Sequence, residues 1–79
     1  MNEIIVINFV SPEKKIQTGI PCLPDDIFAE VEEKFYQQFN EFRNENNKLL
    51  SNGKRILRFK KVRENNIHNG DIVQIFKSE

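Results

Sequence analysis

The sequence predicts an α+β fold in which one long helix packs across a single mixed sheet of four or five strands. The order of the segments supports this prediction: two β-rich segments come first, one segment of helical periodicity follows, and a short hairpin and a final strand end the chain. One helix can cover only one face of a sheet, so a doubly wound fold with helices on both faces is excluded.

The first two strands are expected to form a hairpin. Residues 3–10 are rich in β-branched and aromatic side chains, residues 11–15 supply turn residues, and residues 16–20 resume the β pattern. Proline cannot continue a central strand, so the second strand is expected to end at Pro21. Because side chains alternate between the faces of a strand, we expect these residues to face the core: Ile5, Ile7 and Phe9, and Ile16, Thr18 and Ile20.

The strongest periodicity in the chain predicts a helix over residues 25–43. Apolar residues recur there in steps of three or four, which places them on one stripe of a helix. Asp25 or Asp26 is expected to serve as the N-cap, and Arg43 suits the C-terminal end of the helix dipole. The residues expected to pack on the sheet are Phe28, Val31, Phe35, Phe39 and Phe42.

The last third of the chain is expected to add a small hairpin and one more strand. Residues 48–51 and 54–56 flank an Asn-Gly pair, which is typical of a type I′ turn. Residues 57–66 show no sustained period, and a turn over residues 69–71 precedes a final strand over residues 72–76. If that strand runs parallel beside the first strand, the arrangement is a β-grasp.

Length and composition exclude several classes of protein. A chain of 79 residues forms one domain, here residues 1–79, and its net charge of zero provides no overall attraction to nucleic acid or to an anionic membrane. One cysteine and one histidine cannot form a disulfide or a structural zinc site, so we expect no metal and no cofactor. No signal peptide or membrane span is evident, which favours a soluble, cytoplasmic monomer.

No catalytic constellation is evident in the sequence. His68 lies among polar residues in a turn, and Cys22 has no basic neighbour or second cysteine that would lower its pKa. Carboxylates are frequent in the predicted helix, but neither a pocket-forming loop nor a glycine-rich phosphate cradle accompanies them. The sequence therefore predicts a protein that is not an enzyme, with no catalytic residues.

Four motifs resemble the ubiquitin superfamily, and the resemblance covers most of the chain. The segment from Leu49 to Ile56 (LLSNGKRI) is similar to the ubiquitin strand-turn-strand with its glycine-lysine turn. Val62 follows Ile56 by six residues, and in the pair Asn66-Ile67 the isoleucine follows Ile56 by eleven residues, as in ubiquitin. Residues 66–73 (NIHNGDIV) resemble the ending of many ubiquitin-like domains. The resemblance implies a ubiquitin-like β-grasp fold.

The resemblance also implies a docking surface on the exposed face of the sheet. The positions that match it are Leu50 in the third strand and Gln74 and Phe76 in the last strand. Strand alternation points the same way, because these three side chains face outward if Leu49, Val73 and Ile75 face the core. Lys48 and Lys77 are expected to rim the apolar centre, which suits an acidic amphipathic helix or a ubiquitin-pathway component as partner.

Charge is unevenly distributed along the chain. Seven acidic residues fall within residues 25–45, and seven basic residues without an acid fall within residues 46–63. We therefore expect a dipole that is acidic on the helix and basic on the sheet side. The basic tract is Lys48, Lys54, Arg55, Arg58, Lys60, Lys61 and Arg63, with Phe59 among them. This tract is expected to be mainly a solvated face that partly balances the acidic helix. Among binding functions, docking of an acidic partner groove fits better than tracking of a phosphate backbone.

The leading interpretation is a non-enzymatic ubiquitin-like domain that mediates non-covalent protein–protein interaction. A covalent modifier is an alternative, but no glycine follows Gly70 and the chain stops at Lys77-Ser78-Glu79, so a glycine-ended precursor tail would have to be missing. A ubiquitin-like accessory component of a bacterial type VII secretion system is another alternative. Such proteins resemble this chain in length, in the late Asn-Gly-Asp turn and in lacking Gly-Gly.

Overall fold

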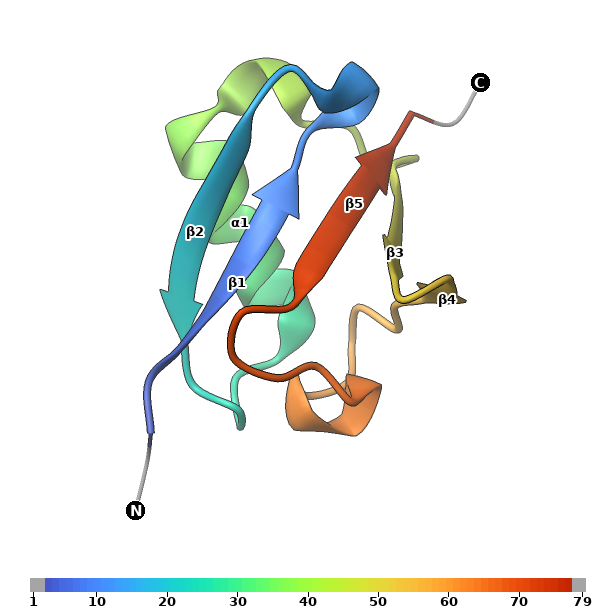
Figure 1. Cartoon of the computed structure of the whole chain (residues 1–79). Coiled ribbons are helices and arrows are strands. Elements are labelled where there is room, and N and C mark those ends of the chain that lie inside the picture. Colours follow the sequence, from blue (N-terminus) through green and yellow to red (C-terminus); the bar gives the residue numbers. More distant parts are fainter. Residues whose placement is uncertain (1–2, 78–79) are drawn as a thin grey trace.

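One helix lies across one face of a five-stranded mixed sheet in this computed structural model, which describes residues 3–77 (Figure 1). The fold class predicted from the sequence is confirmed. The strands and the helix are β1 Ile5–Val10, β2 Gln17–Cys22, α1 Phe28–Gln38, β3 Lys48–Ser51, β4 Lys54–Arg55 and β5 Ile72–Phe76. Three short 3₁₀ turns span Pro12–Lys14, Asn40–Phe42 and Arg63–Asn65. Within the described residues, no helix has the length and apolar character that crossing a membrane requires.

The first and last strands form the parallel centre of the sheet. The strand order is β2-β1-β5-β3-β4, so β1 and β5 are neighbours although more than sixty residues separate them in sequence. They pair in parallel, with Asn8 opposite Ile72 and Val10 opposite Gln74. The hairpin strands β2 and β4 lie at the two edges. This is the β-grasp arrangement.

The core lies between the sheet and α1. Phe9, Phe28 and Phe35 are fully buried, and the Phe9 ring stacks on Phe35 with 5.4 Å between ring centroids. Phe39 and Phe42 pack at the margin of this cluster. The predicted core faces of β1 and of α1 are therefore confirmed. Burying each of these large apolar side chains contributes about 2 kcal/mol to the free energy of folding.

The helix is shorter than predicted at both ends. It begins at Phe28 because the two predicted caps are used elsewhere: the Leu23 amide donates to Asp26, and Arg63 pairs with Asp25. The helix ends at Gln38, where Phe39 leaves the helical region of backbone space with φ −133°. A 3₁₀ turn follows, and within it Phe42 packs against the core.

The second strand is displaced from its predicted range. It runs from Gln17 to Cys22 and includes Pro21, which pairs with Val6. The sequence predicts that the strand ends at Pro21, because proline cannot continue a central strand. However, β2 is an edge strand, where a residue without a backbone N–H costs no ladder hydrogen bond.

A buried polar network joins α1 to the segment after β4. The Glu32 side chain is only 7% exposed, and it accepts hydrogen bonds from Arg58 Nε at 2.7 Å and from the Tyr36 hydroxyl at 2.5 Å. The Asn47 side chain donates to the same hydroxyl at 2.9 Å, and Arg58 also donates to the Asn47 carbonyl. Burial and the Glu32 carboxylate raise the pKa of Tyr36 well above its usual range. The network therefore keeps a neutral phenol beside a buried ion pair.

Replacing Arg58 should destabilise the protein more than an ordinary surface substitution. Arg58→Met keeps most of the aliphatic stem but leaves the Glu32 carboxylate buried without its charge partner, so the free energy of unfolding should fall by about 3 kcal/mol. Urea denaturation measures this loss. The double variant with Glu32→Gln should recover part of it, because a neutral amide can still accept from Tyr36. Equal losses of unfolding free energy in the single and double variants would contradict a stabilising ion pair between Arg58 and Glu32.

Candidate docking surface

The outer face of the sheet, on the side away from α1, carries a set of partly exposed apolar side chains. Val6 is 40% exposed, Ile72 is 49% exposed and Phe76 is 43% exposed, and Leu50 is half-buried among them. No described element of the chain crosses this side of the central strands (Figure 1). We call the outward-facing residues Leu50, Ile72, Gln74 and Phe76 the sheet-face patch.

The register of the sheet places the predicted residues on one surface. Leu50 lies opposite Gln74 and Lys48 lies opposite Phe76, so Leu50 and Phe76 are diagonal neighbours on the same face. Their chain neighbours Leu49, Val73 and Ile75 are buried, as the alternation requires. Lys48 is exposed beside Phe76, and Lys77 is exposed just beyond the end of β5.

Two shallow hollows flank Gln74. One has a volume of about 310 Å³ and lies among Leu50, Asn52, Gly53, Ile72 and Gln74. The other also measures about 310 Å³ and is bounded by Phe76 and by the turn that follows β1. Ile72 was not among the predicted site residues, although the alternation that supports Gln74 and Phe76 also places it outward. The arrangement offers two small depressions on either side of one amide side chain, and the one beside Phe76 is mainly apolar.

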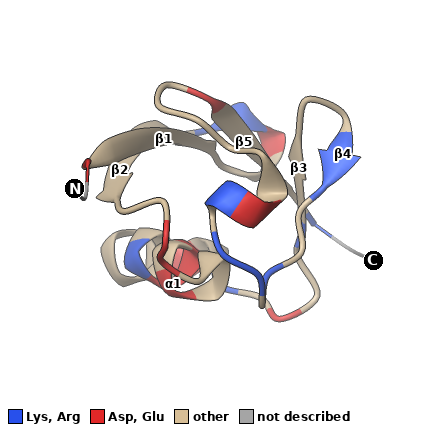
Figure 2. Ribbon diagram, turned by 90° about the horizontal axis from the view of Figure 1, so that it is seen from below, with Lys and Arg blue, Asp and Glu red and all other residues tan. Residues whose placement is uncertain are grey.

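Basic side chains border the sheet-face patch at the β3–β4 edge. Lys48 lies on β3, and Arg55 on β4 is in register with Leu50. Lys54 adds a third positive charge at this edge. Figure 2 shows a run of basic residues on β4 and on the segment that follows it, beside α1, and acidic residues on α1. The patch therefore has an apolar centre and a basic edge.

The predicted charge dipole is only partly realised. The second half of the basic tract lies beside the start of α1 and not on the sheet side, because the amide of Phe28 donates to the carbonyl of Lys60 at 2.9 Å. Two of its members are paired with helix-side acids, Arg58 with Glu32 and Arg63 with Asp25. These two ion pairs neutralise part of the positive charge that was expected to lie free on the sheet side.

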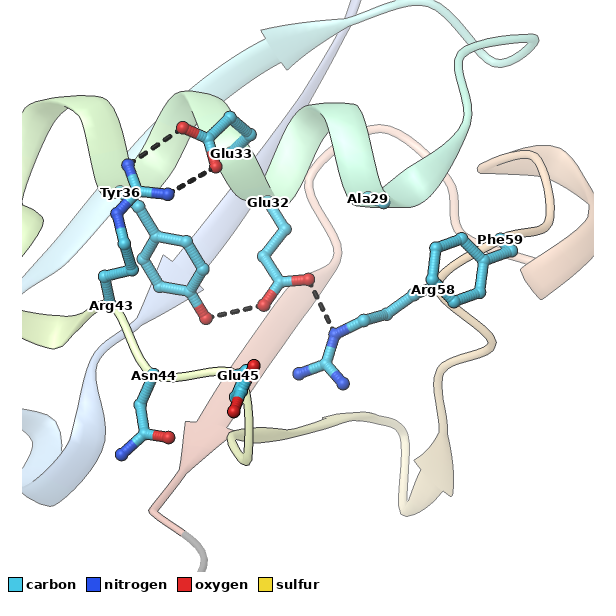
Figure 3. Close-up of a pocket in the computed structure, with 9 residues that line it drawn as sticks. All are labelled: Ala29, Glu32, Glu33, Tyr36, Arg43, Asn44, Glu45, Arg58 and Phe59. Atoms are coloured by element: carbon cyan, nitrogen blue, oxygen red, sulfur yellow. Dashed lines mark hydrogen bonds and ion pairs between the residues drawn. The ribbon is translucent and has the colours of Figure 1, made fainter.

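A charged cleft of about 430 Å³ lies between α1 and the segments around residues 43–45 and 58–59 (Figure 3). Arg43 donates to both oxygens of Glu33, at 2.6 and 2.8 Å, and this pairing lowers the pKa of Glu33. The Arg43 guanidinium also lies 5.5 Å from the centre of the Tyr36 ring. The charges that line the cleft are thus largely engaged with one another, and their contacts are those of a structural network.

The titratable groups that catalysis most often uses are separated. Cys22 is buried in β2, and burial, with the nearby Asp26 carboxylate, raises its thiol pKa to about 11. His68 is exposed in the turn before β5, where its backbone amide donates to Asp71. Among residues 3–77, no group of three side chains could hold a metal ion.

The Cys22 thiol should be unreactive in the folded protein. Its ordinary pKa of 9.0 is raised to about 11, so the reactive thiolate is about 100-fold scarcer at pH 8 than in an unfolded chain. Mass spectrometry should therefore show that iodoacetamide alkylates Cys22 at least this much more slowly in buffer than in guanidinium chloride. Equal rates in the two solvents would mean that the thiol is accessible and ionised.

Similarity to solved structures places this geometry in a known fold. A de novo designed protein based on ubiquitin superposes with a TM-score of 0.79 at 21% identity, over 91% of this chain and 85% of that one. An N-terminal ubiquitin-like domain solved in solution superposes at 0.78 with 14% identity, over 100% and 80%. Ubiquitin of Caldiarchaeum subterraneum superposes at 0.71 with 11% identity, over 98% and 96%. No family model and no curated protein sequence matches the chain. The chain therefore has the ubiquitin-like β-grasp fold.

Proposed function

We propose that this protein is a non-enzymatic interaction domain that docks a partner protein non-covalently on the outer face of its sheet. The observation that carries the proposal is the sheet-face patch, in which large apolar side chains are held in solvent by strand alternation while the other face of the sheet is filled by the core. Apolar residues gathered on one surface favour association, because docking removes their area from water.

The partner that fits the patch is a short amphipathic helix with acidic flanks. A helix can present one apolar stripe to Leu50 and Phe76, and its acidic residues would then face Lys48 and Arg55 at the edge. The apolar anchors supply most of the affinity, and the rim charges mainly set the rate and orientation of docking. The footprint is smaller than a standard interface of about 1,600 Å², so modest affinity is expected.

The covalent-modifier alternative depends on residues outside the described part of the chain. A modifier needs a tail that ends in glycine, and no contact among residues 3–77 bears on such a tail. The secretion-component alternative likewise gains no support from a particular contact. The non-covalent proposal is preferred because it uses a surface that the fold itself presents.

Truncation of the apolar anchors should weaken docking without unfolding the protein. Leu50→Ala and Phe76→Ala should each reduce affinity for a synthetic acidic amphipathic helix by about 1–2 kcal/mol, because each removes apolar area from the centre of the interface. Isotope-labelled protein titrated with this peptide should show amide shifts that centre on residues 48–50 and 72–76. Melting temperatures should stay close to that of the unaltered chain, since neither residue belongs to the core.

Two further variants separate the roles of charge and apolar contact. Lys48→Glu should act mainly on the salt dependence of binding, because the exposed lysine contributes through long-range attraction. Glu30→Ala on the exposed side of α1 serves as the matched control and should leave binding unchanged. Shifts that centre on α1, or full binding by both anchor variants, would refute the sheet-face assignment.

A further inference from the structure

A second apolar surface lies on the segment that follows β4, which runs beside the start of α1. Leu57 is 58% exposed and Phe59 is 84% exposed, which makes Phe59 the most exposed large apolar side chain in the described part of the chain. Between them, Arg58 is turned inward. The usual pattern is inverted here, because the charged side chain of Arg58 is less exposed, at 26%, than the two large apolar side chains beside it. We call Arg55, Leu57, Phe59 and Lys60 the Leu57–Phe59 surface.

The inversion is enforced by the contacts of Arg58. Its guanidinium donates to the buried Glu32 carboxylate and to the Asn47 carbonyl, as the close-up in Figure 3 shows for Glu32. Its own carbonyl accepts from the Ala29 amide at 2.8 Å, so the backbone of the segment is tied to the first turn of α1. With Arg58 held inward, its two neighbours cannot fold into the core.

Leu57 is held by a second set of contacts. Its amide donates to the Asn65 side-chain oxygen at 2.8 Å, and its carbonyl accepts from the Asn65 side-chain nitrogen at 3.0 Å. One asparagine thus satisfies both backbone groups of Leu57. A surface held in this way loses little conformational entropy on binding, and this favours recognition by a few side chains.

The shape and charge of this surface select a type of ligand. An open hollow of about 480 Å³ is lined by residues 55–60, which include Leu57 and Phe59 and the basic residues Arg55 and Lys60. Among residues 3–77, neither of these two basic side chains forms an ion pair with an acid of the chain. The hollow therefore combines apolar lining side chains with two basic groups whose charges are available to a ligand.

We propose that the Leu57–Phe59 surface is a second docking site, which binds a short acidic peptide segment of a partner protein. One apolar side chain of the peptide packs between Leu57 and Phe59, and flanking carboxylates face Arg55 and Lys60. A broad anionic membrane fits less well, because the same segment is hydrogen-bonded to the start of α1, where Asp25, Asp26 and Glu30 would also approach the lipid. A narrow peptide needs to contact only the residues that line the hollow, 55–60, and none of these is acidic.

The experiment titrates the isotope-labelled full chain with a synthetic peptide in which one phenylalanine is flanked by two aspartates on each side. Amide shifts should centre on residues 55–60. Phe59→Ser should weaken binding at least roughly fivefold, a loss typical of an apolar anchor, and Lys60→Glu should weaken it roughly two- to threefold at low salt. Melting temperatures should not fall for either variant, because both side chains are exposed.

Two controls make the result decisive. Leu50→Ala alters the sheet-face patch and should leave binding of this peptide unchanged, so failure of one site can be distinguished from failure of the other. A peptide with lysine in place of aspartate should not bind. The proposal is overturned if the shifts centre on residues 48–50 and 72–76, if Phe59→Ser binds as well as the unaltered chain, or if anionic phosphatidylserine vesicles bind the protein through Phe59 while the peptide does not.

Discussion

The ion pair between Arg58 and Glu32 is the interaction on which the second half of the structure depends. It joins two residues that are 26 positions apart, and it is largely shielded from solvent, so loss of either partner leaves the other without its counter-charge. The same arginine binds the Asn47 carbonyl just before β3. Helix, sheet and connecting segment therefore meet at one guanidinium.

This pairing also determines how α1 begins. The helix has no side-chain cap, and its first amides donate instead to the carbonyls of Arg58 and Lys60. Asp25 and Asp26 are thereby released for an ion pair with Arg63 and a turn hydrogen bond. Backbone carbonyls from a distant segment satisfy the orphan donors of a helix start as well as a local side chain does.

The two proposed surfaces arise from different causes. The sheet-face patch follows from alternation in strands whose other face is filled by the core, and Leu50, Gln74 and Phe76 could be selected from the sequence for that reason. Ile72 also faces outward by strand alternation, but the resemblance to ubiquitin-like domains indicated only Gln74 and Phe76 in β5. Leu57 and Phe59 lie in a segment without periodicity, and their exposure follows only from the inward turn of Arg58. No local sequence pattern indicates that Leu57 and Phe59 are exposed.

The sequence by itself determined the fold class, the order of the elements and the core faces of β1 and α1. Periods of two and of three to four residues are local properties, and they survive folding because burial of one face stabilises them. Only the tertiary structure decided the ends of α1, the place of Pro21 in an edge strand and the partners of the basic tract. These depend on which segments become neighbours in space, and a hydrogen bond or ion pair across 26 or more residues leaves no periodic trace in the chain.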